Sequence, residues 1–240
     1  MPQKQIVAMG GGGWGMEAEN PLLDRYIYDL VKDRSNPRIC FVPTASGDSE
    51  QYIARFYRHF APKPARLSHL SLFEPATSNL ESLILTQDII YVGGGNTKNL
   101  IALWKEWHLD TILRTAWNKG IILCGVSAGS ICWFEQGVTD SIPGAKTVLP
   151  CLGFLRGSNC PHYNKEAYQK GYRRLLSEDA ISFGYAAEDG VALHFTGDRL
   201  SNIVSSRPQA KAYYLEKKNG EVSENILDTK YLGNKSFNIG

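Results

Sequence analysis

The sequence predicts an α/β protein in which helices cover both faces of a parallel sheet. Short apolar runs alternate with longer amphipathic stretches, as strands and crossover helices do in such a sheet. Two of the apolar runs, at 6–9 and 89–92, end in glycine-rich turns. With 240 residues, 43% of them hydrophobic, the chain can bury one sizeable core. We therefore expect a single α/β domain over residues 1–240.

The first half of the chain supplies most of this alternation. Helices are predicted from the helical spacing of apolar residues and from signals at their starts, such as a proline at 21 and a cap at Asp48 or Ser49. In order, we predict a strand at 4–10, a helix at 21–34, a strand and loop at 37–46, a helix at 48–60, a strand at 65–73, a strand, glycine turn and helix within 87–107, a helix at 110–120 and a strand and turn within 121–134.

The second half departs from this pattern. The stretch 137–164 contains three prolines and four glycines and is predicted to be rich in loops. A helix is expected over 166–179, followed by two strands around a turn over 180–195. The stretch 211–227 alternates on both sides of Asn219-Gly220, a pair that suits a type I′ turn, and so predicts a C-terminal β-hairpin.

Charge and cysteine content argue against several classes of protein. The 26 basic and 24 acidic residues give a formal net charge of +2, without the basic footprint of a nucleic-acid-binding protein. The five cysteines are odd in number and show no CxxC spacing, which argues against a disulfide scaffold and a structural zinc site. No apolar run has the roughly 18 residues of a membrane span, and the run at 6–9 is too short for a signal peptide. We expect a cytoplasmic protein that binds neither nucleic acid nor membrane.

The stretch "CGVSAGS" places one serine, Ser127, among small residues where a strand turns into a helix. Gly125, Ser127 and Gly129 match G-x-S-x-G, in which a strained turn exposes the hydroxyl and leaves no room for large neighbours. The N–H groups that follow, beginning with Ala128, can bind an oxyanion. A tight turn with Ser127 as a helix N-cap is the alternative. We interpret Ser127 as a nucleophile.

A serine nucleophile needs a base and an acid that orients the base. Of the five histidines we favour His162, because it lies in a loop after a stretch rich in proline and glycine. His194, in an alternating strand, is the second candidate. Glu188 is favoured as the acid because it ends a predicted strand, and Asp140 competes with it.

The turn "YVGGGN" also ends a strand, and its bare backbone N–H groups could approach a substrate closely. Gly94, Gly95 and Asn96 are therefore candidates for oxyanion or substrate binding, together with Ala128. The turn lacks the G-K-[ST] ending of a phosphate loop. The earlier stretch "MGGGGWG" at 9–15 is expected to form a wall of the same cleft rather than a phosphate cradle.

The segments "YVGGGNT", "CGVSAGS", "PHYN" and "AAEDG" together resemble the serine peptidases of the peptidase E type. That family includes the α-aspartyl dipeptidases and, more distantly, the cyanophycinases. The chain order serine, histidine, glutamate is also similar and differs from the serine, acid, histidine order of α/β-hydrolases. The resemblance runs from the first strand to about residue 195.

The resemblance implies a flavodoxin-like fold similar to class I glutamine amidotransferase domains. It implies Ser127 as nucleophile, His162 as base, Glu188 as orienting acid, and oxyanion donors from the glycine turn and the N–H of Ala128. Asp140 matches an acid that is also implicated in the family's activity. No metal and no organic cofactor is implied.

The dipeptidases of this family bind the substrate's aspartate through an arginine on the helix after the histidine. In this sequence that position falls near Tyr168, with Arg173 and Arg174 close by. The match to an arginine is therefore incomplete, and a preference for N-terminal Asp-X stays an open alternative within the predicted function.

We predict a serine-type, dipeptidase-like hydrolase that cleaves small peptides through an acyl-enzyme, and a homodimer is compatible with the sequence. Three alternatives remain. An α/β-hydrolase esterase would use Ser127 and His194 with Asp179 or Glu188. A glutamine amidotransferase would need a cysteine at the turn, and Cys124 lies three residues early. A non-catalytic module would bind a small ligand through the glycine turns.

Overall fold

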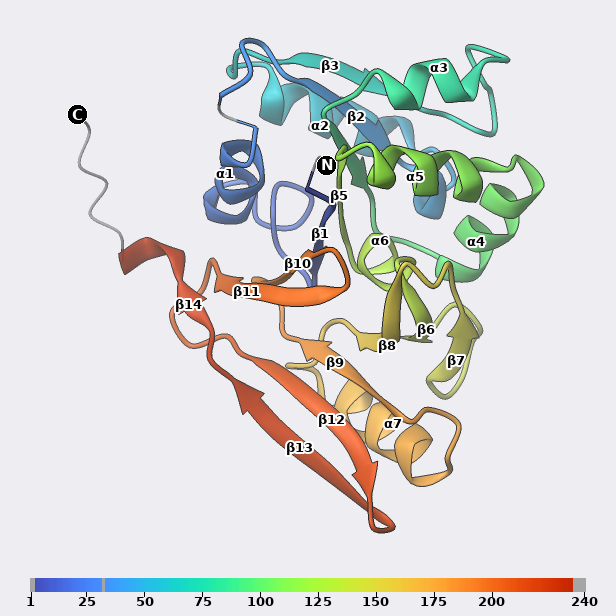
Figure 1. Ribbon diagram of the computed structural model, residues 1–240, viewed down its shortest axis with the longest axis vertical. Coiled ribbons are helices and arrows are strands. Elements are labelled where there is room, and N and C mark those ends of the chain that lie inside the picture. The colour runs from blue at the N-terminus through green and yellow to red at the C-terminus, as the bar shows by residue number, and fades with distance from the viewer. Residues whose placement is uncertain (1–2, 32, 235–240) are drawn as a thin grey trace.

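The computed structural model describes residues 3–31 and 33–234, which form two β-sheets with helices packed against them (Figure 1). Five neighbouring strands of the first sheet run parallel to one another. The strand Val191–Thr196 lies beside the first strand of the chain, Gln5–Met9, and runs antiparallel to it. The spatial order of this eight-stranded sheet is β14 (Lys230–Tyr231), β11 (Arg199–Ser205), β10 (Val191–Thr196), β1 (Gln5–Met9), β5 (Ile122–Val126), β4 (Ile89–Val92), β2 (Arg38–Val42) and β3 (Arg66–His69).

Helices cover both faces of this sheet, because successive residues of its buried strands point to opposite sides. Val7 and Met9 of β1 pack in one cluster with α1 (Leu22–Asp29) and α2 (Glu50–Phe60). Ile6 and Ala8 pack in a second cluster on the other face. The helices of that face are α3 (Leu80–Leu85), α4 (Thr97–Glu106), α5 (Leu109–Asn118) and α6 (Ala128–Ile131), with the short 3₁₀ turn η1 (Thr44–Ser46) beside α4.

The second sheet carries α7 (Glu166–Ser177) on one face, where Tyr172 and Leu176 are fully buried. In Figure 1 it lies below the first sheet, with the hairpin at its outer edge. Its order is β13 (Glu221–Leu227), β12 (Ala212–Lys218), β9 (Phe183–Ala187), β8 (Leu155–Cys160), β6 (Phe134–Thr139) and β7 (Thr147–Pro150).

The fold class and the hairpin predicted from the sequence are confirmed. Asn219 and Gly220 have φ of 53° and 85°, the two positive values that a type I′ turn requires. The expectation of a loop-rich region over 137–164 is wrong in part, because β7, β8 and half of β6 lie there. These strands are short, and a register shift between Phe134 and Gln136 interrupts the pairing of β6 with β8. Such strands leave little period-2 signal in the sequence.

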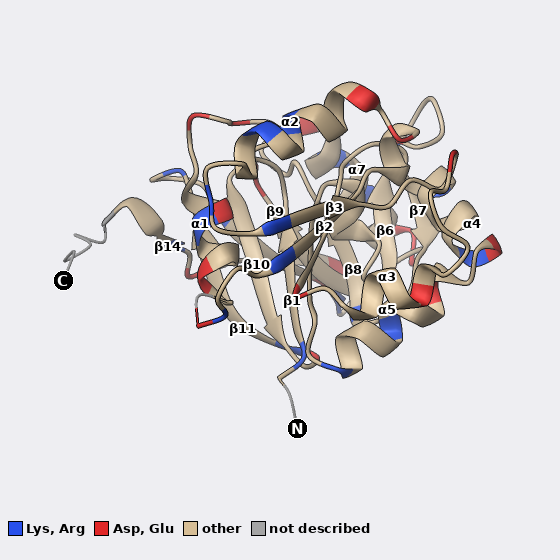
Figure 2. Cartoon of the chain, turned by 90° about the horizontal axis from the view of Figure 1, so that it is seen from above, with Lys and Arg blue, Asp and Glu red and all other residues tan. Residues whose placement is uncertain are grey.

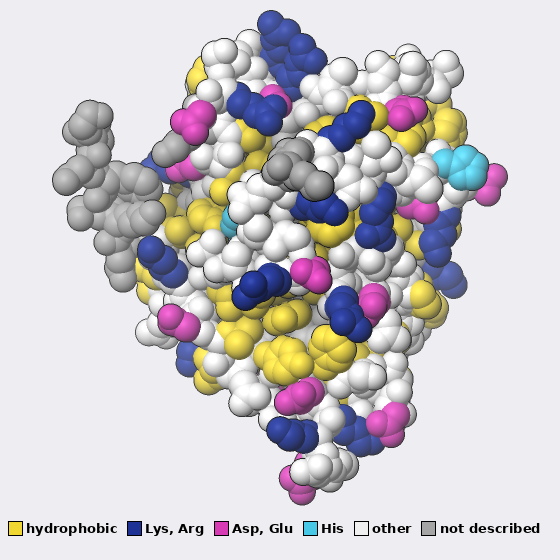
Figure 3. All heavy atoms as spheres, in the orientation of Figure 1, with side chains coloured by type: hydrophobic (Ala, Val, Ile, Leu, Met, Phe, Trp, Pro, Cys, Tyr) yellow, Lys and Arg dark blue, Asp and Glu magenta, His cyan; other side chains and the backbone are white. Residues whose placement is uncertain are grey.

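Residues of both charges alternate along the helices, strands and loops without gathering on one element (Figure 2). On the face drawn in Figure 3, lysines and arginines lie next to aspartates and glutamates around a group of apolar side chains. The described residues include no helix with the length and apolar character needed to cross a membrane.

Three neighbouring strands end at one edge of the first sheet. β1, β5 and β4 lie side by side and run parallel, so the segments after Met9, Val126 and Val92 meet there. These segments are the two glycine-rich turns and the serine turn. Carboxyl ends of parallel strands are where α/β proteins build their sites.

Candidate active site

Ser127 occupies a strained turn between β5 and α6. Its φ and ψ are 56° and −111°, a region that non-glycine residues rarely adopt. Residues with a side chain would clash with neighbouring backbone at the two positions around Ser127. A Cβ on Gly125 would lie 2.4 Å from the carbonyl oxygen of Gly129, and a Cβ on Gly129 would lie 2.3 Å from the carbonyl oxygen of Val92. The G-x-S-x-G pattern is therefore a steric requirement of this turn.

His162 contacts the serine from the loop between β8 and α7. Its Nε2 lies 2.9 Å from Ser127 Oγ, and the residue is only 8% exposed. The backbone is held in place by a hydrogen bond from its N–H to the carbonyl oxygen of Gly10 (3.1 Å). Its φ of 55° is also positive. The chain therefore holds both halves of this pair in uncommon backbone conformations.

The carboxylate that contacts His162 belongs to Asp189, which the sequence analysis did not consider. Asp189 Oδ1 lies 2.5 Å from His162 Nδ1. Glu188, the acid favoured from the sequence, instead accepts hydrogen bonds from the hydroxyl of Tyr213 (2.8 Å) and the N–H of Lys211 (3.1 Å). The two acids follow each other in the turn after β9, and their carboxylates bind different partners. The assignment of Glu188 to His162 is therefore corrected to Asp189.

Asp189 is held in its charged form. Burial by itself would raise its pKa, but hydrogen bonds from His162 and Asn164 outweigh burial and lower the pKa below its usual value. An ionised carboxylate can only accept, so His162 Nδ1 must donate to it. Nε2 then carries a lone pair that faces Ser127 Oγ, which is the tautomer that can accept the serine proton.

Backbone N–H groups suited to bind an oxyanion lie beside the serine. A Cβ on Gly94 would be 3.4 Å from Ser127 Cβ, so the glycine turn passes directly against it. The Gly94 N–H makes only a long bond of 3.5 Å to the hydroxyl of Tyr52. The N–H groups of Gly95 and Ala128 donate to no described residue. α6 has only four residues, so its N–H groups matter here more than a helix dipole.

Asn96, the fourth oxyanion candidate from the sequence, is committed elsewhere. Its N–H donates to the carbonyl oxygen of Ala45 (2.7 Å), and its Oδ1 caps α4 by accepting from the N–H of Asn99 (3.0 Å). Its Nδ2 donates to the carbonyl oxygen of Ser141 (3.0 Å). These bonds place Asn96 between the turn and the loop after β6, and its backbone N–H is not free to bind an oxyanion.

Asp140 reaches the site only through Tyr168. Its Oδ2 accepts from the Tyr168 hydroxyl (2.8 Å) and from Lys146 Nζ (2.9 Å), and the Tyr168 ring packs edge-on against His162 with centroids 5.6 Å apart. Burial would raise the pKa of Asp140, but these two hydrogen bonds lower it overall. Asp140 is therefore a charged neighbour of the site and does not orient the imidazole.

The alternative base lies elsewhere in the first sheet. His194 is 4% exposed and faces Val7 in the middle of β1, not the end where Ser127 lies. Its Nδ1 bonds the hydroxyl of Tyr26 (2.6 Å) and its Nε2 bonds the side chain of Gln5 (3.0 Å). Burial lowers its pKa to about 4. Both ring nitrogens are occupied, so the geometry gives no support to a serine–His194 esterase.

Asp179, the other acid of the esterase alternative, and Cys124, the thiol of the amidotransferase alternative, do not contact the site either. Asp179 pairs with Lys217 at 2.6 Å. Cys124 is fully buried inside β5, where burial raises its thiol pKa far above the usual range. A neutral, buried thiol is a poor nucleophile, which argues against the glutamine amidotransferase alternative.

The first glycine-rich stretch borders the acid of the site. A Cβ on Gly11 would lie 2.0 Å from Asp189 Oδ1, and one on Gly10 would lie 2.4 Å from the carbonyl oxygen of Ala187. Glycine at 10 and 11 therefore leaves room for Asp189 next to His162. This contact agrees with a role of the stretch in the wall of the cleft.

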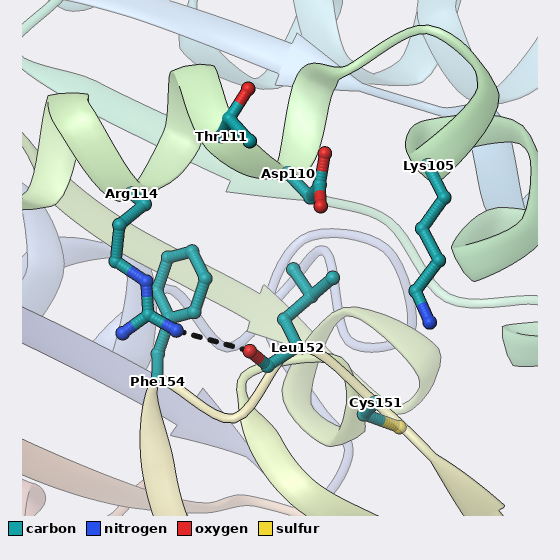
Figure 4. Close-up of a pocket in the computed structure, with 7 residues that line it drawn as sticks. All are labelled: Lys105, Asp110, Thr111, Arg114, Cys151, Leu152 and Phe154. Atoms are coloured by element: carbon teal, nitrogen blue, oxygen red, sulfur yellow. Dashed lines mark hydrogen bonds between the residues drawn. The ribbon is translucent and has the colours of Figure 1, made fainter.

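The described cavities do not coincide with the serine. One of about 380 Å³ lies between α4, α5 and residues 151–154, where the Arg114 guanidinium stacks on Phe154 (Figure 4). None of its lining residues is a candidate site residue. Another, of about 490 Å³, is lined by Asn164, Glu188 and Asp189 but not by Ser127. Among the described residues, no three His, Cys, Asp or Glu side chains could hold a metal ion.

Comparison with known proteins identifies the family of the chain. The family model for peptidase family S51 matches residues 6–203. The chain is 55% identical over 231 residues to the uncharacterised peptidase YgaJ of Bacillus subtilis (strain 168), covering 96% of this chain and all of that protein. It is also 27% identical over 153 residues to an uncharacterised Listeria innocua peptidase, Lin0382, covering 58% of this chain and 71% of that one.

Solved structures show the same fold at low identity. A peptidase from an acI-B1 actinobacterium superposes with a TM-score of 0.68 at 18% identity, covering 95% of both chains. A candidate peptidase E of Listeria monocytogenes EGD-e superposes with a TM-score of 0.56 at 16% identity, covering 94% of this chain and all of the other. The resemblance to peptidase E-like proteins is thereby confirmed: the chain belongs to peptidase family S51 and is a serine-type peptidase.

Proposed function

We propose that the protein hydrolyses short peptides through an acyl-enzyme formed on Ser127, with His162 as base and Asp189 as the orienting acid. One observation carries the proposal: a continuous chain of contacts from Ser127 Oγ to His162 (2.9 Å) and from His162 to Asp189 (2.5 Å). Such a chain activates an otherwise weak hydroxyl nucleophile.

In the proposed reaction, His162 Nε2 takes the proton as Ser127 Oγ attacks the peptide carbonyl. Asp189 stabilises the imidazolium that forms, and the N–H groups of Gly95 and Ala128 stabilise the oxyanion. Loss of one such donor costs about 3–4 kcal/mol in well-studied cases. His162 then protonates the leaving amine, which departs. Water, deprotonated by the same imidazole, cleaves the ester and restores the serine.

The proposed substrate is a short peptide whose N-terminal side chain need not be aspartate. Arg173 pairs with Glu224 (2.8 Å) and Arg174 with Glu178 (2.7 Å), so neither of the arginines near the family's aspartate-binding position is free. Lys146 is a cation beside Tyr168, but Asp140 neutralises it. We therefore expect Ala-X and Asp-X dipeptides to be turned over at similar rates.

A fluorophosphonate probe and a dipeptide screen test the proposal. The probe should form an adduct on Ser127 in the wild-type protein, and Ser127→Ala should abolish both adduct and dipeptide turnover while the circular dichroism spectrum stays unchanged. Turnover that persists in Ser127→Ala would show that another group attacks the peptide.

A further inference from the structure

The carboxylate that bonds His162 is itself held by a side chain that the proposed reaction does not use. Asn164 Nδ2 donates to Asp189 Oδ2 (3.2 Å), and the N–H of Asp189 donates to Asn164 Oδ1 (3.0 Å). One amide thus bonds both the side chain and the backbone of one acid. Two such bonds restrict the rotation of the carboxylate as well as its distance, and they leave Oδ1 directed at His162.

The same turn carries the base and this amide. The N–H of Lys165 donates to the carbonyl oxygen of His162 (2.9 Å), which closes a four-residue turn over 162–165. Asn164 lies inside that turn, and the positive φ of His162 begins it. The backbone conformation that aims the imidazole at Ser127 therefore also sets the position of the amide that holds Asp189.

Asn164 and Asp189 also border the same open space. Both residues line the cavity of about 490 Å³, together with Glu188 and Arg207. The Glu188 carboxylate is bound by Tyr213 and does not replace Asn164. Without the amide, Asp189 Oδ2 would lose its donor at the edge of this cavity. Water there would compete for the carboxylate and weaken its hold on the imidazole.

We propose that Asn164 is a positioning residue for the reaction of Ser127, because it fixes the Asp189 carboxylate in the orientation that His162 needs. The inference rests on the proposed function and extends its chain of contacts by one residue. A purely structural role, in which Asn164 only closes the turn, makes different predictions for the variants below.

The test compares Asn164→Asp and Asn164→Ala with the wild-type protein. Asn164→Asp keeps the volume and the oxygen that accepts from the Asp189 N–H, but places an acceptor against Asp189 Oδ2. Asn164→Ala removes both bonds. Asn225→Asp on β13, where the side chain is exposed and makes only a long bond to Ser223, is the matched control.

The main readout is the rate at which a fluorophosphonate labels Ser127 over a range of pH. Both variants at Asn164 should label about tenfold more slowly at neutral pH, the effect of losing one hydrogen bond to a charged group. In Asn164→Asp the added negative charge should also move the midpoint of the pH profile upward, because it favours the protonated imidazole. The other charged groups around Asn164, namely Lys165, Glu188 and Arg207, are the same in every variant. Asn225→Asp should match the wild type.

Proton NMR supplies a second readout that does not depend on turnover. The proton between His162 Nδ1 and Asp189 should resonate far downfield in the wild type, and it should move upfield or broaden in both variants.

If Ser127 labels in the wild type but both variants keep its rate, pH midpoint and downfield proton, the inference is wrong and the proposed function stands. If the folded wild type neither labels nor cleaves dipeptides, the proposed function is wrong, and the NMR comparison still decides the role of Asn164. Should Asn164→Ala fail to fold, the isosteric Asn164→Asp alone decides it.

Discussion

At the residue scale, the two acids that follow β9 are adjacent in the chain but have different partners. Asp189 bonds His162, whereas Glu188 bonds Tyr213 on β12. Asp189→Asn should lower kcat by about ten-thousand-fold, the loss seen when the triad acid of a serine protease becomes an amide, because the wrong imidazole tautomer is favoured. Glu188→Gln should change kcat by no more than about twofold, as expected for a substitution away from the reacting groups. Steady-state kinetics on one dipeptide measures both, and equal losses would contradict the assignment of Asp189.

Gly11 offers a steric test of the same carboxylate. A Cβ there would lie 2.0 Å from Asp189 Oδ1, so Gly11→Ala must displace the acid from His162. Displacement by about 1 Å can cost about a hundredfold in rate, and a loss of that order in kcat/KM is expected. Gly47→Ala is the control: nothing lies within 4 Å of an added Cβ, so it should keep the wild-type kcat/KM, although an alanine at its φ of 68° should cost about 1–2 kcal/mol of stability. Normal kinetics in Gly11→Ala would mean that the wall of the cleft yields without moving Asp189.

At the scale of single elements, the start of α4 is connected to the loop after β6. Asn96 caps the helix through Oδ1 and holds the carbonyl oxygen of Ser141 through Nδ2, next to Asp140. Thr139 Oγ1 bonds the Ser141 hydroxyl (2.8 Å), which adds to the tie. These bonds fix the position of the loop after β6 relative to the glycine turn before α4.

Asn96→Ala removes both contacts of this side chain, and comparison with a variant that loses only a helix cap separates their effects. Loss of the cap should lower the free energy of unfolding by about 1 kcal/mol, and loss of the Ser141 contact should raise KM because the loop at Asp140 is released. Asn79→Ala is the matched control, since Asn79 caps α3 by accepting from the N–H of Ser82 but has no contact with this loop. Chemical denaturation and dipeptide kinetics measure the two effects. If KM rises equally in both variants, the contact with Ser141 has no part in binding.

At the scale of the whole molecule, the turn between β9 and β10 joins the two sheets. β9 belongs to the second sheet and β10 to the first, and residues 188–190 cross between them. Ser127 extends from the first sheet, and His162 follows β8 of the second. The site is therefore assembled where the sheets meet. Its geometry depends on how the two sheets pack against each other.

The free energy of unfolding should depend on pH because of one buried acid, Asp24. The side chain of Asp24 on α1 is fully buried, its Oδ2 is 3.4 Å from His59 Nε2, and burial raises its pKa to about 7. Between the ordinary pKa of 3.8 and about 7, the unfolded chain loses this proton while the folded chain keeps it. The free energy of unfolding must therefore fall as pH rises through this window, by at most about 1.4 kcal/mol per unit from this group.

Asp24→Asn removes that titration. Relative to the wild type, the variant should gain stability as pH rises from about 4 to about 7, because the neutral amide has no proton to lose. Urea denaturation at several pH values gives the free energy of unfolding of both proteins. Taking the difference between them cancels the contribution of His59 that is the same in both. A difference that stays constant with pH would show that Asp24 is ionised in the folded state or gains charge without cost.

The amino-acid sequence by itself determined the features that depend on local sterics and pattern. The alternation of apolar runs is enough for an α/β sheet, and Asn219-Gly220 is enough for the hairpin turn. Ser127 could be found because Gly125 and Gly129 are required within two residues of it, at contacts that local chain geometry imposes. The loop position of His162 was accessible because prolines and glycines are frequent in the stretch before it.

Tertiary structure alone decided which acid meets the imidazole and which donors are free. Glu188 and Asp189 carry the same charge at the same turn, and only the packing of β9 against β12 directs one to Tyr213 and the other to His162. Asn96 is polar and well placed in the sequence, yet Ala45 and Ser141, about 50 residues before and 45 after it, take up its hydrogen bonds. Such choices depend on contacts between residues far apart in the chain, which neither periodicity nor spacing records.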